Sequence, residues 1–130
     1  MRALLPLLLL TLFCTCAPAP EKATAQEAAP TVYEDLSPAE FAERIGAENA
    51  VLIDVRTPGE IAKGKIDGAL EMDYRAPNFA SQLEQLDPNK TYLIYCASGG
   101  RSGKTCGMLN DAGFANVYNL KGGYSAWKQQ

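Results

Sequence analysis

The sequence predicts an α/β protein, in which helices cover both faces of an open parallel sheet. Residues 92–95 form a continuous apolar run, and residues 51–55 form another that is broken only by Asp54. Such runs are typical of strands buried on both faces, because strands with one solvated face alternate apolar with polar residues. Helix signals separate the strand signals, and the connections between them are short. This alternation favours parallel strands joined by helical crossovers.

The first predicted elements are a short strand at residues 31–33 and a capped helix. Ser37 stands at the helix N-cap, Pro38 occupies the first helical position, and Glu40 follows three residues after the cap. This is the pattern of a capping box with proline at its preferred site. Three side chains are expected to make the apolar face of that helix: Leu36, Phe41 and Ile45.

The later elements continue the alternation. A short helix is expected from Pro58 and a strand at residues 68–72. Gly113 is expected to end a long helix in the left-handed conformation. The remaining elements are predicted in this order along the chain: a strand at 51–55, a helix at 79–86, a strand at 92–95, a helix at 102–112, a strand at 117–120 and a helix at 124–128.

Composition and charge exclude several classes of function. The chain has 130 residues, of which 47% are hydrophobic, enough for one compact domain. Its 12 basic and 15 acidic residues give a net charge of −3, which argues against a nucleic-acid partner. The absence of histidine excludes Ser–His–Asp hydrolysis, Cys–His proteolysis and His-ligated zinc. Any nucleophile must therefore be activated by other means.

The N-terminal segment predicts export. Arg2 precedes an apolar run at residues 3–13, which is shorter than the roughly 20 residues of a membrane span but fits a secretory signal. Two processing sites stay open: cleavage before Gln26, or lipidation of Cys16 as in a bacterial lipoprotein. Residues 1–16 are thus expected to act as the signal of a periplasmic protein, with a membrane tether through Cys16 as one alternative.

Residues 17–30 are predicted to be a tether, and residues 31–130 the folded domain. Six alanines and three prolines stand among the fourteen tether residues, without an aromatic side chain. Such a segment buries too little apolar surface to offset the entropy of ordering it.

The candidate site follows the strand at residues 92–95, because ligands of open parallel sheets bind beyond the carboxyl ends of the strands. Cys96 begins a loop that contains Gly99 and Gly100 and then enters a helix. Adjacent glycines let successive N–H groups point inward as an anion-binding nest, and the helix N-terminus adds positive potential. A cysteine facing such a nest ionises more readily, so Cys96 is the candidate nucleophile.

Three segments together resemble a single-domain rhodanese: residues 52–60 with 64–69, residues 96–102 and residues 113–127. The resemblance implies a sulfurtransferase in which Cys96 takes a sulfane sulfur from thiosulfate or a similar small anionic donor. The persulfide then passes its sulfur to a thiol or to cyanide, and neither a cofactor nor a metal is expected. The resemblance also implies that five residues cradle the substrate: Ala97, Ser98, Gly99, Gly100 and Arg101.

The sequence departs from related patterns at two places. The family often has histidine where this chain has Lys65, a change expected to affect local packing and charge rather than catalysis. Cysteine phosphatases place five residues between the cysteine and the arginine of the loop, whereas four separate Cys96 from Arg101. The shorter loop favours a sulfur-centred anion over phosphate.

Several other residues allow two interpretations. Arg101 is either a substrate clamp or a surface charge, and clamping is favoured by its place in the loop. Asp54 and Arg56 are expected to form an internal ion pair rather than to catalyse. Cys106 is interpreted as a small buried hydrophobe, with a resolving thiol as the alternative. Two further pairs have structural interpretations: Tyr124 and Trp127 packing on the sheet, and Arg75 and Lys104 solvated.

Two functions therefore remain open. The first is an exported sulfurtransferase, which the complete loop with Arg101 favours. The second is a binding or redox-sensing module of the same fold that keeps Cys96 but turns over little.

Overall fold

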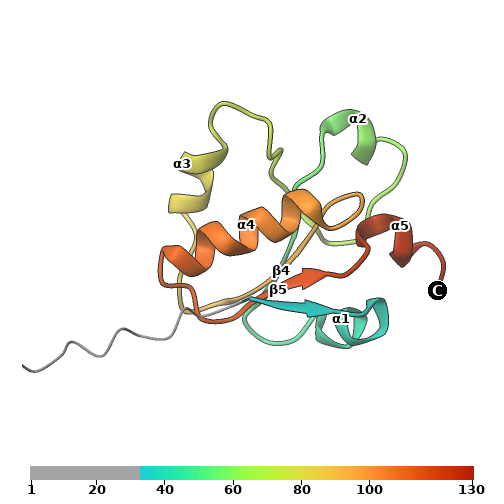
Figure 1. Cartoon of the computed structure of the whole chain (residues 1–130), viewed down its shortest axis with the longest axis horizontal. Helices are drawn as coiled ribbons and strands as arrows, with labels where there is room; N and C mark the ends of the chain where they lie inside the picture. The colour runs from blue at the N-terminus through green and yellow to red at the C-terminus, as the bar shows by residue number, and fades with distance from the viewer. Residues whose placement is uncertain (1–32) are drawn as a thin grey trace, which may run out of the picture.

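Five parallel strands form one sheet in the order β1-β5-β4-β2-β3, as seen in a computed structural model that describes residues 33–130 (Figure 1). The predicted open parallel sheet is confirmed. Its strands are β1 (Glu34–Leu36), β2 (Ala50–Asp54), β3 (Leu70–Glu71), β4 (Thr91–Tyr95) and β5 (Val117–Leu120). The two longest strands, β2 and β4, pair over their full length in the middle of the sheet.

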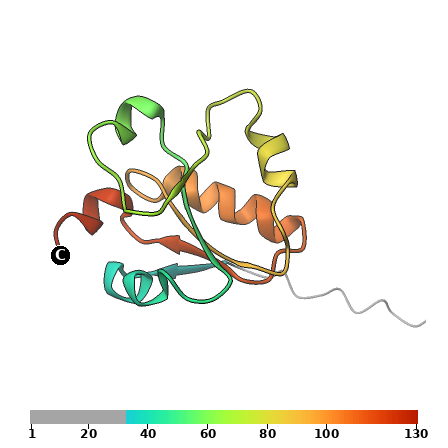
Figure 2. The same cartoon turned by 180° about the vertical axis from the view of Figure 1, so that it is seen from behind.

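Helices cover both faces of this sheet. The helices are α1 (Pro38–Arg44), α2 (Pro58–Ile61), α3 (Phe79–Glu84), α4 (Gly100–Asp111) and α5 (Gly123–Trp127). Figures 1 and 2 show α3 and α4 on the side of the sheet opposite to α1. Side chains of α5 pack on the same face as α1, and α2 has no buried residue. The domain thus has three layers.

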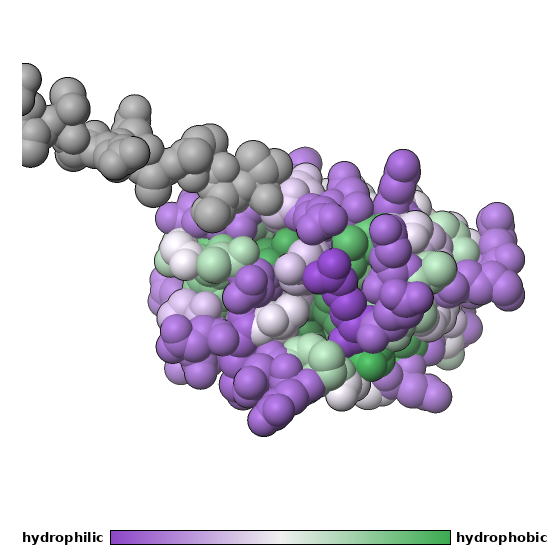
Figure 3. Space-filling view, turned by 90° about the horizontal axis from the view of Figure 1, so that it is seen from below, coloured by the Kyte–Doolittle hydropathy of each residue, from purple (hydrophilic) through white to green (hydrophobic). Residues whose placement is uncertain are grey.

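The side chains of β4 show how the two cores are separated. Tyr92 and Ile94 point into the apolar cluster beneath α3 and α4, whereas Leu93 and Tyr95 point into the cluster beneath α1 and α5. All four are at most 1% exposed. The continuous apolar run is therefore a strand buried on both faces, as predicted. Figure 3 shows one outer face, on which hydrophilic side chains predominate and hydrophobic ones form small patches.

The capping signals are confirmed, and three boundaries are corrected. The Ser37 side chain accepts from the Glu40 N–H, and the Glu40 carboxylate accepts from the Ser37 N–H at 2.9 Å. Among the described residues the first strand is Glu34–Leu36 and excludes Tyr33, whereas residues 31–32 of the predicted strand lie outside the described part. Leu36 therefore belongs to β1 and contributes to the core from the strand. The strand expected at residues 68–72 pairs only at Leu70–Glu71.

The remaining boundary correction concerns α4. This helix begins at Gly100, two residues before its predicted start, and Gly113 after it has a φ of 91°, as expected for a left-handed stop. The substrate loop predicted from the sequence therefore includes the first turn of the helix. The N–H groups of that turn have no partner within the helix and are available to a ligand.

The predicted signal at residues 1–16 and the tether at residues 17–30 lie outside the described residues. Within residues 33–130, no helix combines the length and the apolar composition that crossing a membrane requires.

Candidate functional site

Cys96 lies between the end of β4 and the start of α4, with its sulfur turned toward the loop. The Gly99 N–H donates to Sγ at 3.1 Å, and the Ser102 hydroxyl donates to Sγ at 3.3 Å. Gly99, whose N–H makes this contact, has a φ of 100°, a left-handed conformation that favours glycine. The whole residue Cys96 is 1% exposed. The loop therefore encloses the sulfur within a set of directed donors.

Two opposing effects act on the Cys96 thiol. Burial raises its pKa, because a desolvated thiolate is disfavoured. Hydrogen bonds from the Ser102 hydroxyl and from the backbone N–H groups of Ser102, Ser98 and Gly99 outweigh burial and lower the pKa below its ordinary value. The expected nest of inward N–H groups is thus present, and it stabilises a thiolate without histidine.

The N-terminus of α5 fixes the loop from behind. The Tyr124 N–H donates to the Cys96 carbonyl at 2.8 Å, and the Ser125 N–H donates to the Ala97 carbonyl at 3.0 Å. Gly123 allows this approach, because a Cβ there would lie 2.6 Å from the backbone of Cys96 and Ala97. Sequence reasoning did not assign this role, although the paired glycines at 122–123 are the signal that could have revealed it.

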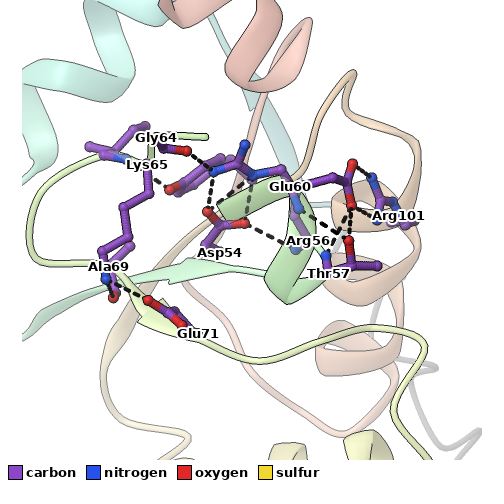
Figure 4. A network of polar contacts seen from close by, with 11 residues as sticks. Asp54, Arg56, Thr57, Glu60, Gly64, Lys65, Ala69, Glu71 and Arg101 are labelled. Carbon is purple, nitrogen blue, oxygen red and sulfur yellow. Dashed lines mark hydrogen bonds and ion pairs between the residues drawn. The ribbon is translucent and has the colours of Figure 1, made fainter. Parts of the chain in front are cut away.

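Arg101 is bound to Glu60, a partner that sequence reasoning missed. Its two terminal nitrogens donate to the two Glu60 carboxylate oxygens at 2.9 and 2.7 Å (Figure 4). The same carboxylate accepts from the Thr57 N–H and hydroxyl at 2.9 Å in the capping box of α2. These donors, with Arg101 first among them, hold the pKa of Glu60 far below its usual range.

The position of Arg101 bears on its two interpretations. Its side chain is 19% exposed, so it is not a freely solvated surface charge. Glu60 carries the main share of raising its pKa, and the neighbouring Cys96 sulfur raises it further. The guanidinium is therefore held in place by Glu60, and the clamp stays a prediction.

Asp54 and Arg56 form the predicted internal ion pair. The Arg56 Nη2 lies 2.7 Å from Asp54 Oδ2, and both side chains are buried. Arg56 also donates to the Gly64 carbonyl at 2.8 Å (Figure 4). Its guanidinium lies 4.2 Å from the centre of the Tyr124 ring. The pair joins β2 to the loop after α2 and to α5, so its role is to hold these segments together.

Asn119 in β5 contacts the same loop and was also missed. Its Nδ2 donates to Asp35 Oδ1 at 2.7 Å and approaches the Gly99 carbonyl at 3.4 Å. Its Oδ1 is buried without a hydrogen-bond partner. A buried amide with one unsatisfied atom is costly, which indicates that its position next to Gly99 matters.

The remaining candidate residues lie in structural positions. Cys106 is 0% exposed in the apolar cluster under α4, and burial raises the pKa of its thiol, as expected for a small buried hydrophobe. Lys65 pairs with Glu71 at 2.7 Å. Tyr124 and Trp127 pack on the cluster beneath α1, as predicted. Two other cations are exposed: Arg75 and Lys104.

Fold and site together define an α/β protein with a buried cysteine whose pKa is lowered by hydrogen bonds from its loop. The family model for the rhodanese-like domain matches residues 37–130, and the chain therefore belongs to this family. A sulfurtransferase of Allochromatium vinosum is 38% identical over 80 residues, which cover 62% of this chain and 73% of that protein.

Two further comparisons agree with this assignment. A thiosulfate sulfurtransferase of Pseudomonas entomophila is 33% identical over 96 residues, covering 74% of this chain and 85% of that protein. The crystal structure of a rhodanese-related protein from Thermoplasma volcanium matches with a TM-score of 0.65 at 26% identity, over 75% of this chain and 92% of the other. The predicted fold and the resemblance stated from the sequence are confirmed.

Proposed function

We propose that this protein is a sulfurtransferase that carries sulfane sulfur as a persulfide on Cys96. The observation that carries the proposal is the convergence of three backbone N–H groups and one hydroxyl on a buried thiol whose pKa they lower. The family assignment and the sulfurtransferase relatives support the same activity. We further propose thiosulfate as a donor, by analogy with the relative of that name.

The transfer takes two displacements at sulfur. The Cys96 thiolate attacks the outer sulfur of thiosulfate, a Cys–S bond forms, and the S–S bond of the donor breaks as sulfite leaves with its electron pair. A thiolate or cyanide then attacks the terminal sulfur of the persulfide, and Cys96 leaves as a thiolate. The same N–H donors stabilise Cys96 as the attacking and as the leaving group.

Residues 97–101 provide the proposed cradle for the donor and for the bound sulfur. The N–H groups of the first helical turn suit the sulfonate oxygens, because a helix N-terminus attracts anions. Arg101 adds guanidinium N–H donors, which Glu60 orients and whose charge it balances. The proposal uses no general base, because the hydrogen bonds that lower the pKa of Cys96 favour its thiolate.

Loop length supports sulfur rather than phosphate transfer. Four residues separate Cys96 from Arg101, and the N–H groups converge close to Sγ. A phosphate monoester would need more room for in-line attack, and such placement contributes on the order of 7–11 kcal/mol in well-oriented reactions. Insertion of one glycine between Gly99 and Gly100 should therefore lower sulfur transfer and admit weak hydrolysis of aryl phosphates.

The proposal is tested by mass spectrometry of the purified protein after treatment with thiosulfate. We expect wild type to gain one sulfur atom and to lose it on treatment with cyanide. We expect no addition to Cys96→Ser. Continuous thiosulfate:cyanide assays then measure turnover. A persulfide that forms but turns over less than once per hour would favour the binding or sensing module instead. Absence of any added sulfur would overturn the proposal.

We also propose that the protein is exported, because an apolar run follows Arg2 and precedes Cys16 and the alanine- and proline-rich segment. Mature protein from the native host is expected outside the cytoplasm without residues 1–13. Lipidation would be supported if the wild-type protein is extracted into detergent and the Cys16→Ala variant is not. Intact Met1 on cytoplasmic protein would contradict both forms of processing.

A further inference from the structure

A depression of about 180 Å³ lies beside the Cys96 loop, between α2 and α5. Ala97, the residue after the nucleophile, forms part of its wall. Lys63, just after α2, and Lys128, just after α5, line it together with Arg56 and Tyr124. Figure 1 shows that α2 and α5 both lie at the edge of the sheet where the strands end. The depression is thus next to the Cys96 loop at two places: at Ala97, and at Glu60, which binds Arg101.

The charges around this depression do not cancel. Arg56 is neutralised by Asp54, and the Glu60 carboxylate in the wall is neutralised by Arg101. Lys63 and Lys128 are exposed, and neither forms an ion pair within residues 33–130. Two positive charges therefore remain in the lining of the depression, in a protein whose net charge is −3. This local excess of positive charge would attract an anionic ligand to the depression.

The aromatic ring of Tyr124 helps to place one of these charges. The Lys128 Nζ lies 5.3 Å from the centre of the Tyr124 ring, within the range of a cation–π contact. Tyr124 is itself fixed, because Arg56 lies 4.2 Å from the same ring and the Tyr124 N–H donates to the Cys96 carbonyl. Tyr124 thereby links Lys128 to the backbone of Cys96.

The size of the depression indicates which sulfur acceptor it suits in the second half-reaction. One water molecule occupies about 30 Å³ in the liquid, so the space corresponds to about six waters or a short chain of heavy atoms. Cyanide carries only one atom beyond its reacting carbon, and the sulfonate group of thiosulfate leaves as sulfite before the acceptor arrives. A thiol with a short chain and a negative end group would place that end in the depression.

We propose that Lys63 and Lys128 form an acceptor subsite for small thiols that carry a carboxylate, and this proposal rests on the proposed sulfur transfer. The thiolate of such an acceptor attacks the outer sulfur of the Cys96 persulfide, and a new S–S bond forms on the acceptor. The bond to Cys96 breaks, and the Cys96 thiolate is regenerated with its electron pair. The two lysines bind the carboxylate and take no part in bond making.

The test compares three thiols of similar size that differ in charge: 3-mercaptopropionate, 2-mercaptoethanol and cysteamine. The full-length protein is first loaded with thiosulfate, freed of excess donor, and mixed with each thiol; loss of the persulfide is followed by mass spectrometry. Second-order rate constants are expressed per thiolate, because the three thiols ionise differently. We expect the carboxylate to react about tenfold faster than the ammonium compound, and this ratio to fall at high salt.

Variants identify the residues responsible. Lys63→Gln with Lys128→Gln should bring the carboxylate-to-ammonium ratio close to one, whereas Lys90→Gln, at the opposite ends of the strands, should keep the wild-type ratio. A ratio of two acceptors measured on one preparation does not change when part of the protein is misfolded.

Two outcomes would overturn the proposal in distinguishable ways. Equal rates for all three thiols in wild type, or an unchanged ratio in the double variant, would refute the subsite and leave the sulfurtransferase intact. Failure of thiosulfate to load Cys96 would refute the proposed function, and the subsite with it.

Discussion

Cys96 and Cys106 can be compared directly, because both belong to the apolar cluster beneath α4 and both are almost fully buried, at 1% and 0% exposure. Their thiols nevertheless shift in opposite directions. The pKa of Cys96 is lowered, whereas burial, followed by the charge of Asp35, raises the pKa of Cys106. Burial is therefore not what distinguishes a reactive cysteine from an inert one.

The difference lies in the N–H groups around each sulfur. Cys96 precedes the helix, where N–H groups have no partner in the helix and turn toward its sulfur. Cys106 lies within α4, where N–H groups are used by the helix itself, and its sulfur faces apolar side chains. Ten residues along the same segment thus separate a thiol that is stabilised as an anion from one that is stabilised as a neutral group.

The largest expected effect is the loss of activity when the reactive member of the pair is removed. Cys96→Ser should abolish transfer of sulfur from thiosulfate to cyanide, because the hydroxyl does not ionise at neutral pH. Cys106→Ala should keep most of the activity and cost about 1 kcal/mol of stability, as for loss of one small buried group. Steady-state assays and chemical denaturation measure both. Equal loss of activity in the two variants would make Cys106 a resolving thiol.

A smaller effect is expected when the support of the loop is disturbed and both thiols are kept. In Gly123→Ala the new methyl group would lie 2.6 Å from the Cys96 and Ala97 backbone, at a residue with a φ of 60°. The loop must move, at a cost of about 1–3 kcal/mol. Alkylation of Cys96 by iodoacetamide at neutral pH should slow by more than tenfold. Gly107→Ala is the matched control, because a methyl group there meets nothing within 4 Å.

Removal of one hydrogen-bond donor to Cys96 should moderately reduce the pKa difference between the two thiols. Ser102→Ala deletes the hydroxyl that donates to Cys96 Sγ at 3.3 Å while leaving the backbone donors in place. One hydrogen bond contributes about 1 kcal/mol, so the alkylation rate at neutral pH should fall about fivefold. The full pH profile of alkylation should move to higher pH. An unchanged profile would mean that the backbone N–H groups alone stabilise the thiolate.

The smallest expected effect is on how the free energy of unfolding depends on pH. The sign of this dependence differs between the two cysteines. Folding lowers the pKa of Cys96, so its contribution to stability is complete above the unfolded pKa and is lost as the pH falls through the folded pKa. Folding raises the pKa of Cys106, so stability is lost above the unfolded pKa. Denaturation of wild type, Cys96→Ala and Cys106→Ala between about pH 6 and 10 separates the two slopes. Slopes of the same sign would contradict the comparison.

The sequence predicted the elements of the fold because its strands and caps are local signals. The run at residues 92–95 and the Ser37 capping box both depend on neighbouring residues, and both are confirmed. The strand at Glu34–Leu36 was not predicted, because an edge strand of three residues with two exposed side chains leaves little hydrophobic pattern.

The site was predicted only where its residues are contiguous. Cys96, the glycines after it and Arg101 follow one another in the chain, so their chemistry was visible. Glu60 lies 41 residues from Arg101, and its capping role in α2 already accounts for its position. Asn119 approaches Gly99 from a neighbouring strand. Contacts of this kind depend on how strands are ordered in the sheet, which local patterns do not specify.

The two hydrogen bonds from α5 to the Cys96 loop have a consequence for hydrogen exchange. The amide protons of Tyr124 and Ser125 are bound to the carbonyls of Cys96 and Ala97, so they exchange with solvent only when helix and loop separate. Their exchange rates therefore report how often the loop opens. A sulfur bound to Cys96 that tightens the loop should slow these two protons together, so two backbone amides outside the nucleophilic loop would record whether it is loaded.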